Sequence, residues 1–141
     1  MSGKRDPITY KGRSLGILTL TAVQVLIGAI HLTVGLTLLA DEISVTQATV
    51  PYDVYTIAFG TLVLVFASFI WQGKKAGWVG TIAALLFVAV ADTLTLLSLP
   101  SIPGIPTFAA PTEIGYSIVV IICLVLPHVR KKFKITLIHT L

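Results

Sequence analysis

The feature that most constrains this chain is an apolar run from Leu15 to Ala40 that contains no Lys, Arg, Asp or Glu. A helix needs about 20 apolar residues to cross the ~30 Å hydrocarbon core of a bilayer. This run exceeds that length, and three further apolar runs follow it. The sequence therefore predicts an all-α fold, an antiparallel bundle of four transmembrane helices at about residues 14–40, 53–72, 76–99 and 112–127.

The composition supports a membrane location. The chain is 55% hydrophobic and only 11% charged, whereas soluble domains carry about 25% charged residues. We therefore expect the lipid bilayer to surround a single domain, residues 14–128, between a basic arm (1–13) and a basic tail (129–141). The first apolar run is much longer than the apolar part of a signal peptide, so we expect it to remain as a helix.

The ten basic residues fall into three clusters, in the arm, in the turn between the second and third helices, and in the tail. They are Lys4, Arg5, Lys11, Arg13, Lys74, Lys75, Arg130, Lys131, Lys132 and Lys134. With four spans, all three clusters lie on one side of the membrane, and the positive-inside bias assigns that side to the cytoplasm. We predict a multi-pass plasma-membrane protein with cytoplasmic N- and C-termini. This topology explains the net charge of +4 without nucleic acid as a partner.

Two ionisable residues within the predicted spans, His31 and Asp92, are the main candidates for a functional site, because such residues are costly in a bilayer. Each lies about 16 residues from the cytoplasmic end of its helix, and the first and third helices run in the same direction. The two side chains therefore match in depth, and we expect a His31–Asp92 hydrogen bond. A supporting face of polar and small residues comprises Gln24, Gly28, Gly35, Thr81 and Thr95.

Three interpretations of this pair stay open from sequence. The contact is purely structural, or it takes part in proton, ion or ligand handling, or the two side chains do not meet and Asp92 reaches external water. The proline-rich segment from Leu99 to Pro106 is either a stiff connector or a lid above Asp92.

Catalytic, cofactor-binding and metal-binding motifs are not evident. The single cysteine, Cys123, excludes an internal disulfide and a Cys-x-x-Cys pair. His31 and Asp92 alone are two ligands short of a closed zinc site. His128 and His139 lie near the opposite, cytoplasmic end. We therefore expect neither an enzyme nor a cofactor.

A faint internal repeat relates the two halves of the chain. Pro51-x-Asp53 opens the second predicted helix, and Pro111-x-Glu113 opens the fourth. The repeat reflects either duplication of a helical hairpin or the chance similarity of apolar sequences.

The chain resembles small four-helix membrane proteins of archaea and bacteria that have no assigned function. The resemblance rests on Gly12-Arg13-Ser14-Leu15-Gly16-Ile17, on Trp71-Gln72-Gly73-Lys74-Lys75-Ala76-Gly77-Trp78, and on Pro127-His128-Val129-Arg130-Lys131-Lys132-Phe133. It implies the topology but no activity and no site residue.

The leading functional expectation is an integral membrane accessory, scaffold or interaction subunit. The alternative is a small oligomeric transporter or channel with His31 and Asp92 on a polar pathway. Both interpretations include self-association or assembly into a larger membrane complex. A membrane enzyme acting on lipid or quinone is the least supported.

Overall fold

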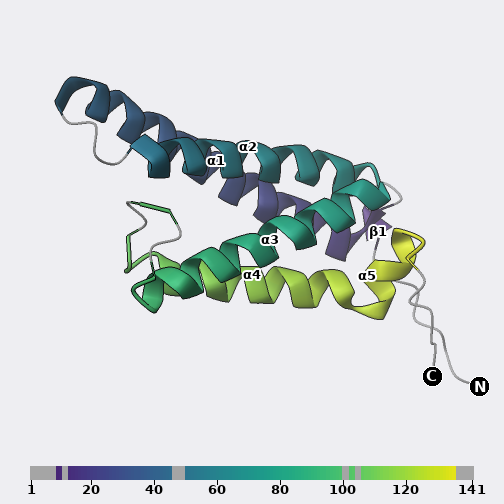
Figure 1. Cartoon of the computed structure of the whole chain (residues 1–141). Coiled ribbons are helices and arrows are strands. Elements are labelled where there is room, and N and C mark those ends of the chain that lie inside the picture. Colours follow the sequence, from purple (N-terminus) through teal and green to yellow (C-terminus); the bar gives the residue numbers. More distant parts are fainter. Residues whose placement is uncertain (1–8, 11–12, 46–49, 100–101, 104–105, 136–141) are drawn as a thin grey trace, which may run out of the picture.

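The computed structural model of the chain describes residues 9–10, 13–45, 50–99, 102–103 and 106–135 (Figure 1). These residues form five helices and one small β-hairpin. The elements are β1 (Thr9–Tyr10), β2 (Arg13–Ser14), α1 (Leu15–Val45), α2 (Val50–Trp71), α3 (Lys75–Leu96), α4 (Ala110–Val125) and α5 (Pro127–Lys132).

Figure 1 shows α1 to α4 lying side by side, with the short α5 at one end of the bundle. α1 packs mainly on α2, α2 on α3, and α3 on α4. Three helices are long and apolar enough to cross a membrane, and α4, with 16 residues, is a shorter apolar helix. The described chain is thus an all-α membrane protein with three candidate spans and a shorter fourth helix.

The largest differences between the observed and the predicted elements are the following, while the other helix ends shift by up to three residues. α1 continues to Val45, beyond the predicted end at residue 40. The fourth helix ends at Val125, just before the predicted end at residue 127, because Pro127 has no N–H to continue α4 and instead begins α5, which extends into the predicted basic tail. Within the expected basic arm, β1 and β2 pair in antiparallel fashion, with Thr9 opposite Ser14. Residues 1–8 of the arm and 136–141 of the tail lie outside the described residues.

The turn between α2 and α3 is a Schellman-type helix end. Gly73 adopts a φ of +71°, a backbone conformation that a side chain disfavours. Its N–H donates to the Ile70 carbonyl, and the N–H of Lys74 donates to the Phe69 carbonyl. This tight turn brings α3 back along α2, so that Trp78 on α3 can donate from Nε1 to the Leu124 carbonyl of α4 at 2.9 Å.

Glycines bring α1 and α2 into close backbone contact. A Cβ atom on Gly60 would lie 2.7 Å from the Leu32 nitrogen and 2.8 Å from the Gly28 carbonyl oxygen. A Cβ on Gly35 would lie 2.9 Å from the backbone nitrogen of Ile57. Small residues allow such approach in membrane helix pairs, where van der Waals contact drives association. The α1–α2 hairpin is therefore fixed at a separation that only glycine permits.

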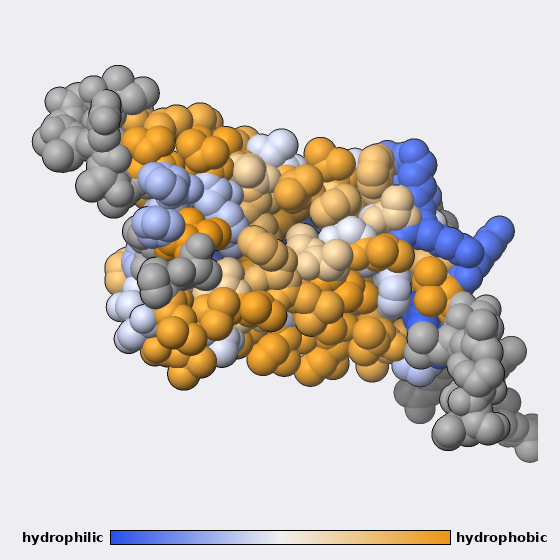
Figure 2. All heavy atoms as spheres, in the orientation of Figure 1, coloured by the Kyte–Doolittle hydropathy of each residue, from blue (hydrophilic) through white to orange (hydrophobic). Residues whose placement is uncertain are grey.

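The buried apolar core reaches the end of the bundle where α5 lies. Its members there include Ile17 and Leu20 of α1, Ile70 of α2, Leu124 of α4, and Phe133, which is 1% exposed. On the face seen in Figure 2, apolar residues also cover the middle of the surface, and hydrophilic residues gather toward the two ends. This pattern fits a bundle whose middle is surrounded by lipid.

Candidate functional site

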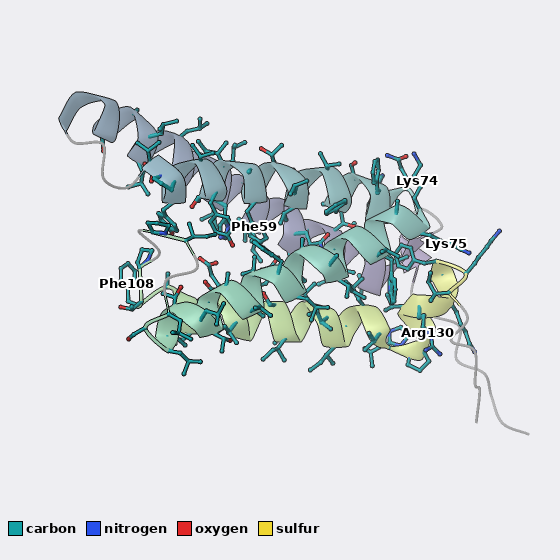
Figure 3. All side chains as sticks on the ribbon, viewed as in Figure 1. Phe59, Lys74, Lys75, Phe108 and Arg130 are labelled. Atoms are coloured by element: carbon teal, nitrogen blue, oxygen red, sulfur yellow. The ribbon has the colours of Figure 1, made fainter. Side chains whose placement is uncertain are left out.

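The polar interior of the bundle lies at the end opposite α5. Figure 3 shows Phe108 at this end and Lys74, Lys75 and Arg130 at the other. A cavity of about 340 Å³ lies here between α1, α2 and the beginning of α4. Its lining residues are Ile30, His31, Val34, Tyr52, Thr56, Phe108, Ala109, Thr112 and Glu113. The cavity is largely apolar, with His31 and Glu113 as its ionisable groups.

His31 is held in one orientation by three neighbours. Its Nδ1 lies 2.9 Å from the Ile27 carbonyl oxygen of the preceding turn. Its ring meets the Phe59 ring edge-on, with centroids 5.0 Å apart and planes at 74°. Its Nε2 lies 3.7 Å from Glu113 Oε1. The imidazole is thereby fixed between α1 and α2 and directed at α4.

The protonation of His31 determines how its Nε2 meets Glu113. A carbonyl oxygen can only accept, so Nδ1 carries a hydrogen and donates it to Ile27. If Nε2 and the Glu113 carboxyl both lacked a proton, two lone pairs would face each other. The 3.7 Å contact is therefore favourable only when the imidazole is charged or the carboxyl is protonated.

Asp92 lies beside this contact, and its carboxyl group interacts with another acid, Glu113. Its residue is 1% exposed, and within the described part of the chain neither carboxylate oxygen has a hydrogen bond. Glu113 is its principal ionisable neighbour, followed by His31. The structure thus places His31 and Asp92 at the same end of the bundle, as their depths predict. It does not form the direct hydrogen bond between them, because Glu113 of α4 takes the position facing the imidazole.

A second buried carboxylate, Asp53 of α2, lies at the same end. It is 1% exposed, and neither of its oxygens has a hydrogen bond to a described residue. The Tyr52 hydroxyl interacts electrostatically with Asp53, Asp92 and Glu113 alike. We call these three acids the carboxylate cluster. Together with His31, the cluster brings one ionisable side chain from each of the helices α1 to α4 to one end of the bundle.

The predicted supporting residues serve the packing of the bundle. Gln24 is 1% exposed and donates from Nε2 to Thr81 Oγ1 at 3.2 Å, which joins α1 to α3. Gly28 and Gly35 lie against α2. Thr95 donates to the Ala91 carbonyl of its own helix at 3.0 Å. None of the five lines the cavity.

Two members of the carboxylate cluster, Asp53 and Glu113, are missed by the sequence argument, which treats them as acids in the first turn of a helix. The Pro51-x-Asp53 and Pro111-x-Glu113 repeat is the signal that would have found them. It places both acids at the start of helices that begin on the same side of the bundle. Asp92 is near the end of α3 and therefore lies on that side too.

Metal chemistry gains no support here. Among the described residues, no group of three His, Cys, Asp or Glu side chains converges closely enough to hold a metal ion. The proposed lid falls partly on residues 100–101 and 104–105, outside the described residues. Phe108, just after that segment, lines the cavity and is 83% exposed.

Comparisons of the chain with protein-family models, with curated proteins and with solved structures found no match. The resemblance to small four-helix prokaryotic proteins therefore stays a prediction, and the functional argument depends on the geometry of the site.

Proposed function

We propose that this integral membrane protein binds an organic cation at the carboxylate cluster, as a small transporter or a ligand-binding subunit. The observation that carries the proposal is the buried carboxyl group of Asp92, whose main polar neighbour is a second acid, Glu113, and which has no basic or amide hydrogen-bond donor among the described residues. A purely structural polar contact would satisfy that carboxylate, since buried polar groups in proteins are nearly always hydrogen-bonded. The site therefore favours ligand handling over a scaffold function.

The charge balance of the site supports a cationic ligand. One imidazole cannot neutralise three carboxylates. The Lys and Arg side chains of α2 to α5 lie at the opposite end of the bundle, where Lys74, Lys75 and Arg130 are labelled in Figure 3. An uncompensated acid within a membrane span is costly and marks an ion or substrate pathway. The deficit is made up either by bound protons or by a cation that enters the cavity.

The cavity's size and lining support an organic cation over a simple metal ion. A volume of about 340 Å³ falls within the range of small-molecule sites. Its apolar and aromatic side chains, Ile30, Val34, Tyr52 and Phe108, would contact the carbon skeleton. Aromatic faces also attract a cation directly. Glu113 would then supply the charge at the cavity wall, with Asp92 behind it.

The topology belongs to the same proposal. We propose that α4 crosses the membrane with the three longer helices, giving an antiparallel four-span bundle with both termini in the cytoplasm. α4 packs along α3 through the Trp78–Leu124 hydrogen bond. A cavity at the far end would then face the outside of the plasma membrane. Because one protomer offers little room for a full pathway, we propose that a transporter form is oligomeric and non-enzymatic.

Binding of tetraphenylphosphonium to the purified protein in mild detergent tests this function. We expect saturable binding by equilibrium dialysis, at least tenfold weaker in Asp92→Asn and Glu113→Gln. Asp41→Asn is the matched control, because it removes an exposed acid of α1 outside the cavity. The proposal is wrong if the wild type shows no saturable binding, or if all three variants bind equally.

A second measurement separates a transporter from a binding subunit. Proteoliposomes loaded with a hydrophilic organic cation such as choline, which does not readily cross a protein-free bilayer, would show a saturable flux that Glu113→Gln abolishes if the protein transports. Binding without flux would assign the protein to a ligand-binding subunit of a larger complex.

A further inference from the structure

A second cavity lies between α1 and α4, at the α5 end of the bundle. Its volume is about 400 Å³. It is lined by Leu15, Gly16, Thr19, Leu20, Val23, Val119, Val120, Cys123, Leu126, His128 and Val129. The lining from the two long helices is mainly aliphatic. In a membrane, the acyl chains of lipids are the abundant molecules that can occupy an aliphatic cavity between two helices.

Basic residues follow the α5 end of this cavity along the chain. His128 and Val129 of α5 line it, and Arg130 follows directly in the same short helix. The Nε of Arg130 is buried and has no hydrogen-bond partner within the described residues. Lys131 and Lys132 complete the last turn of α5, and both are exposed. A buried guanidinium nitrogen without a partner marks the place where an acceptor is expected.

We propose that this cavity, with Arg130, binds an anionic phospholipid. One acyl chain would lie between α1 and α4, and the phosphate would accept hydrogen bonds from the Arg130 guanidinium and from His128. Arginine suits this task because its planar fork matches the phosphate oxygens. Basic pockets between membrane helices bind acidic headgroups for the same reason. This inference concerns a different end of the molecule and is independent of the proposed cation site.

Charge complementarity selects this occupant over the others. A free phosphate would use Arg130 but leave the aliphatic cavity unfilled. A second copy of the chain would bring the same basic α5 toward this one. A zwitterionic lipid would fill the cavity but carry its own positive group to the basic mouth. An anionic phospholipid satisfies both parts of the site.

The test compares lipid binding by native mass spectrometry of the whole chain in detergent, with phosphatidylglycerol and phosphatidylcholine of identical acyl chains. We expect the wild type to bind phosphatidylglycerol at least fivefold more tightly. Arg130→Gln should weaken that binding about fivefold, the factor that corresponds to ~1 kcal/mol per basic side chain. Lys75→Gln, which removes an exposed charge near the same end but outside the cavity, is the control and should bind like the wild type.

A second pair of variants tests the cavity itself. A Cβ at Gly16 would meet nothing within 4 Å, and Gly16 lines the cavity, so Gly16→Leu places a large aliphatic side chain there. It should weaken the binding of both lipids. Gly115→Leu is the matched control, because Gly115 also has open space and lies outside the cavity. Thermal unfolding of each variant without lipid shows that its fold is intact.

Four outcomes would overturn the proposal. The first is equal binding of the two lipids, and the second is an equal effect of Arg130→Gln and Lys75→Gln on that binding. The third is displacement of phosphatidylglycerol by glycerol 3-phosphate as effectively as by the whole lipid. The fourth is a protein dimer, disrupted by Gly16→Leu, in place of a lipid adduct. The first two indicate non-selective surface binding. The third indicates a phosphate site, and the fourth an interface between copies of the chain.

Discussion

Gln24 of α1 donates a hydrogen bond of 3.2 Å to Thr81 of α3, across the interior of the bundle. The two helices are not neighbours in the main packing scheme, in which α1 lies on α2 and α2 on α3. The hydrogen bond therefore links the two helical hairpins directly. It lies below the carboxylate cluster, about two turns from His31 along α1, so it sets the distance between α1 and α3 beneath the site.

This link predicts a coupling between the two side chains. Gln24→Leu and Thr81→Val should each lower the free energy of unfolding, and the double variant should lose less than the sum. Interhelical hydrogen bonds in membranes average about 0.6 kcal/mol, with a maximum near 1.7, so we expect a coupling energy in that range. Reversible unfolding in mixed detergent gives the double-mutant cycle. Additive losses would show that the hydrogen bond contributes nothing.

The close contact between α1 and α2 predicts that Gly60 cannot be replaced by alanine without a loss of stability. Gly60→Ala would place a Cβ 2.7 Å from backbone of α1, so the helices must separate. We expect destabilisation of about 1–3 kcal/mol, the usual cost of overpacking. Gly115→Ala is the control, because its Cβ would meet nothing within 4 Å. Equal unfolding midpoints for the two variants would contradict the close contact.

If the carboxylate cluster binds a cation, its acids should lower the free energy of unfolding of the protein without ligand. Asp92→Asn keeps the shape of the side chain and removes its charge, so the protein without ligand should become more stable. The gain should be modest, because the amide that replaces the carboxyl group is itself a buried polar group and only the cost of the charge is removed. The same variant should lose binding of tetraphenylphosphonium.

The control for this prediction is Asp41→Asn, which lies outside the cavity and should not change the binding of the cation. Thermal unfolding with and without the cation measures both effects in one experiment. If Asp92→Asn were less stable than the wild type, the carboxylate would have a stabilising partner, and the argument for a vacant cation site would fail.

The helical part of the fold could be predicted because the bilayer imposes it. A charge-free run such as Leu15–Ala40 has no other stable form in hydrocarbon, where every backbone N–H and C=O needs an internal partner. The end of α4 is harder to predict, because Pro127 within an apolar run permits either a kink or a break in the helix. The β-hairpin at Thr9–Ser14 was missed, since a polar segment of that length has no apolar alternation to reveal it.

Only part of the candidate site could be predicted from the sequence. Depth along a helix follows from the rise per residue, so His31 and Asp92 could be placed at one level. Rotation about the helix axis and the order of helices around the bundle depend on packing that no single sequence shows. Glu113 faces the imidazole for that reason, although it reads in the sequence as an acid that begins a helix.

The distribution of basic residues predicts a topology that chemical labelling can test. In a Cys123→Ser background, Thr107→Cys places one thiol at the cavity end, and Lys75→Cys places one in the turn at the opposite end. Both positions are exposed. In Figure 3, Lys75 lies at one end of the bundle, and Phe108, the neighbour of Thr107, lies at the other.

A membrane-impermeant maleimide should label the Thr107→Cys variant on intact cells. The Lys75→Cys variant should react only after permeabilisation, because the positive-inside bias holds its neighbours in the cytoplasm. The reverse pattern would invert the bundle and make the carboxylate cluster face the cytoplasm, and labelling of both variants on intact cells would show that α3 does not cross the membrane.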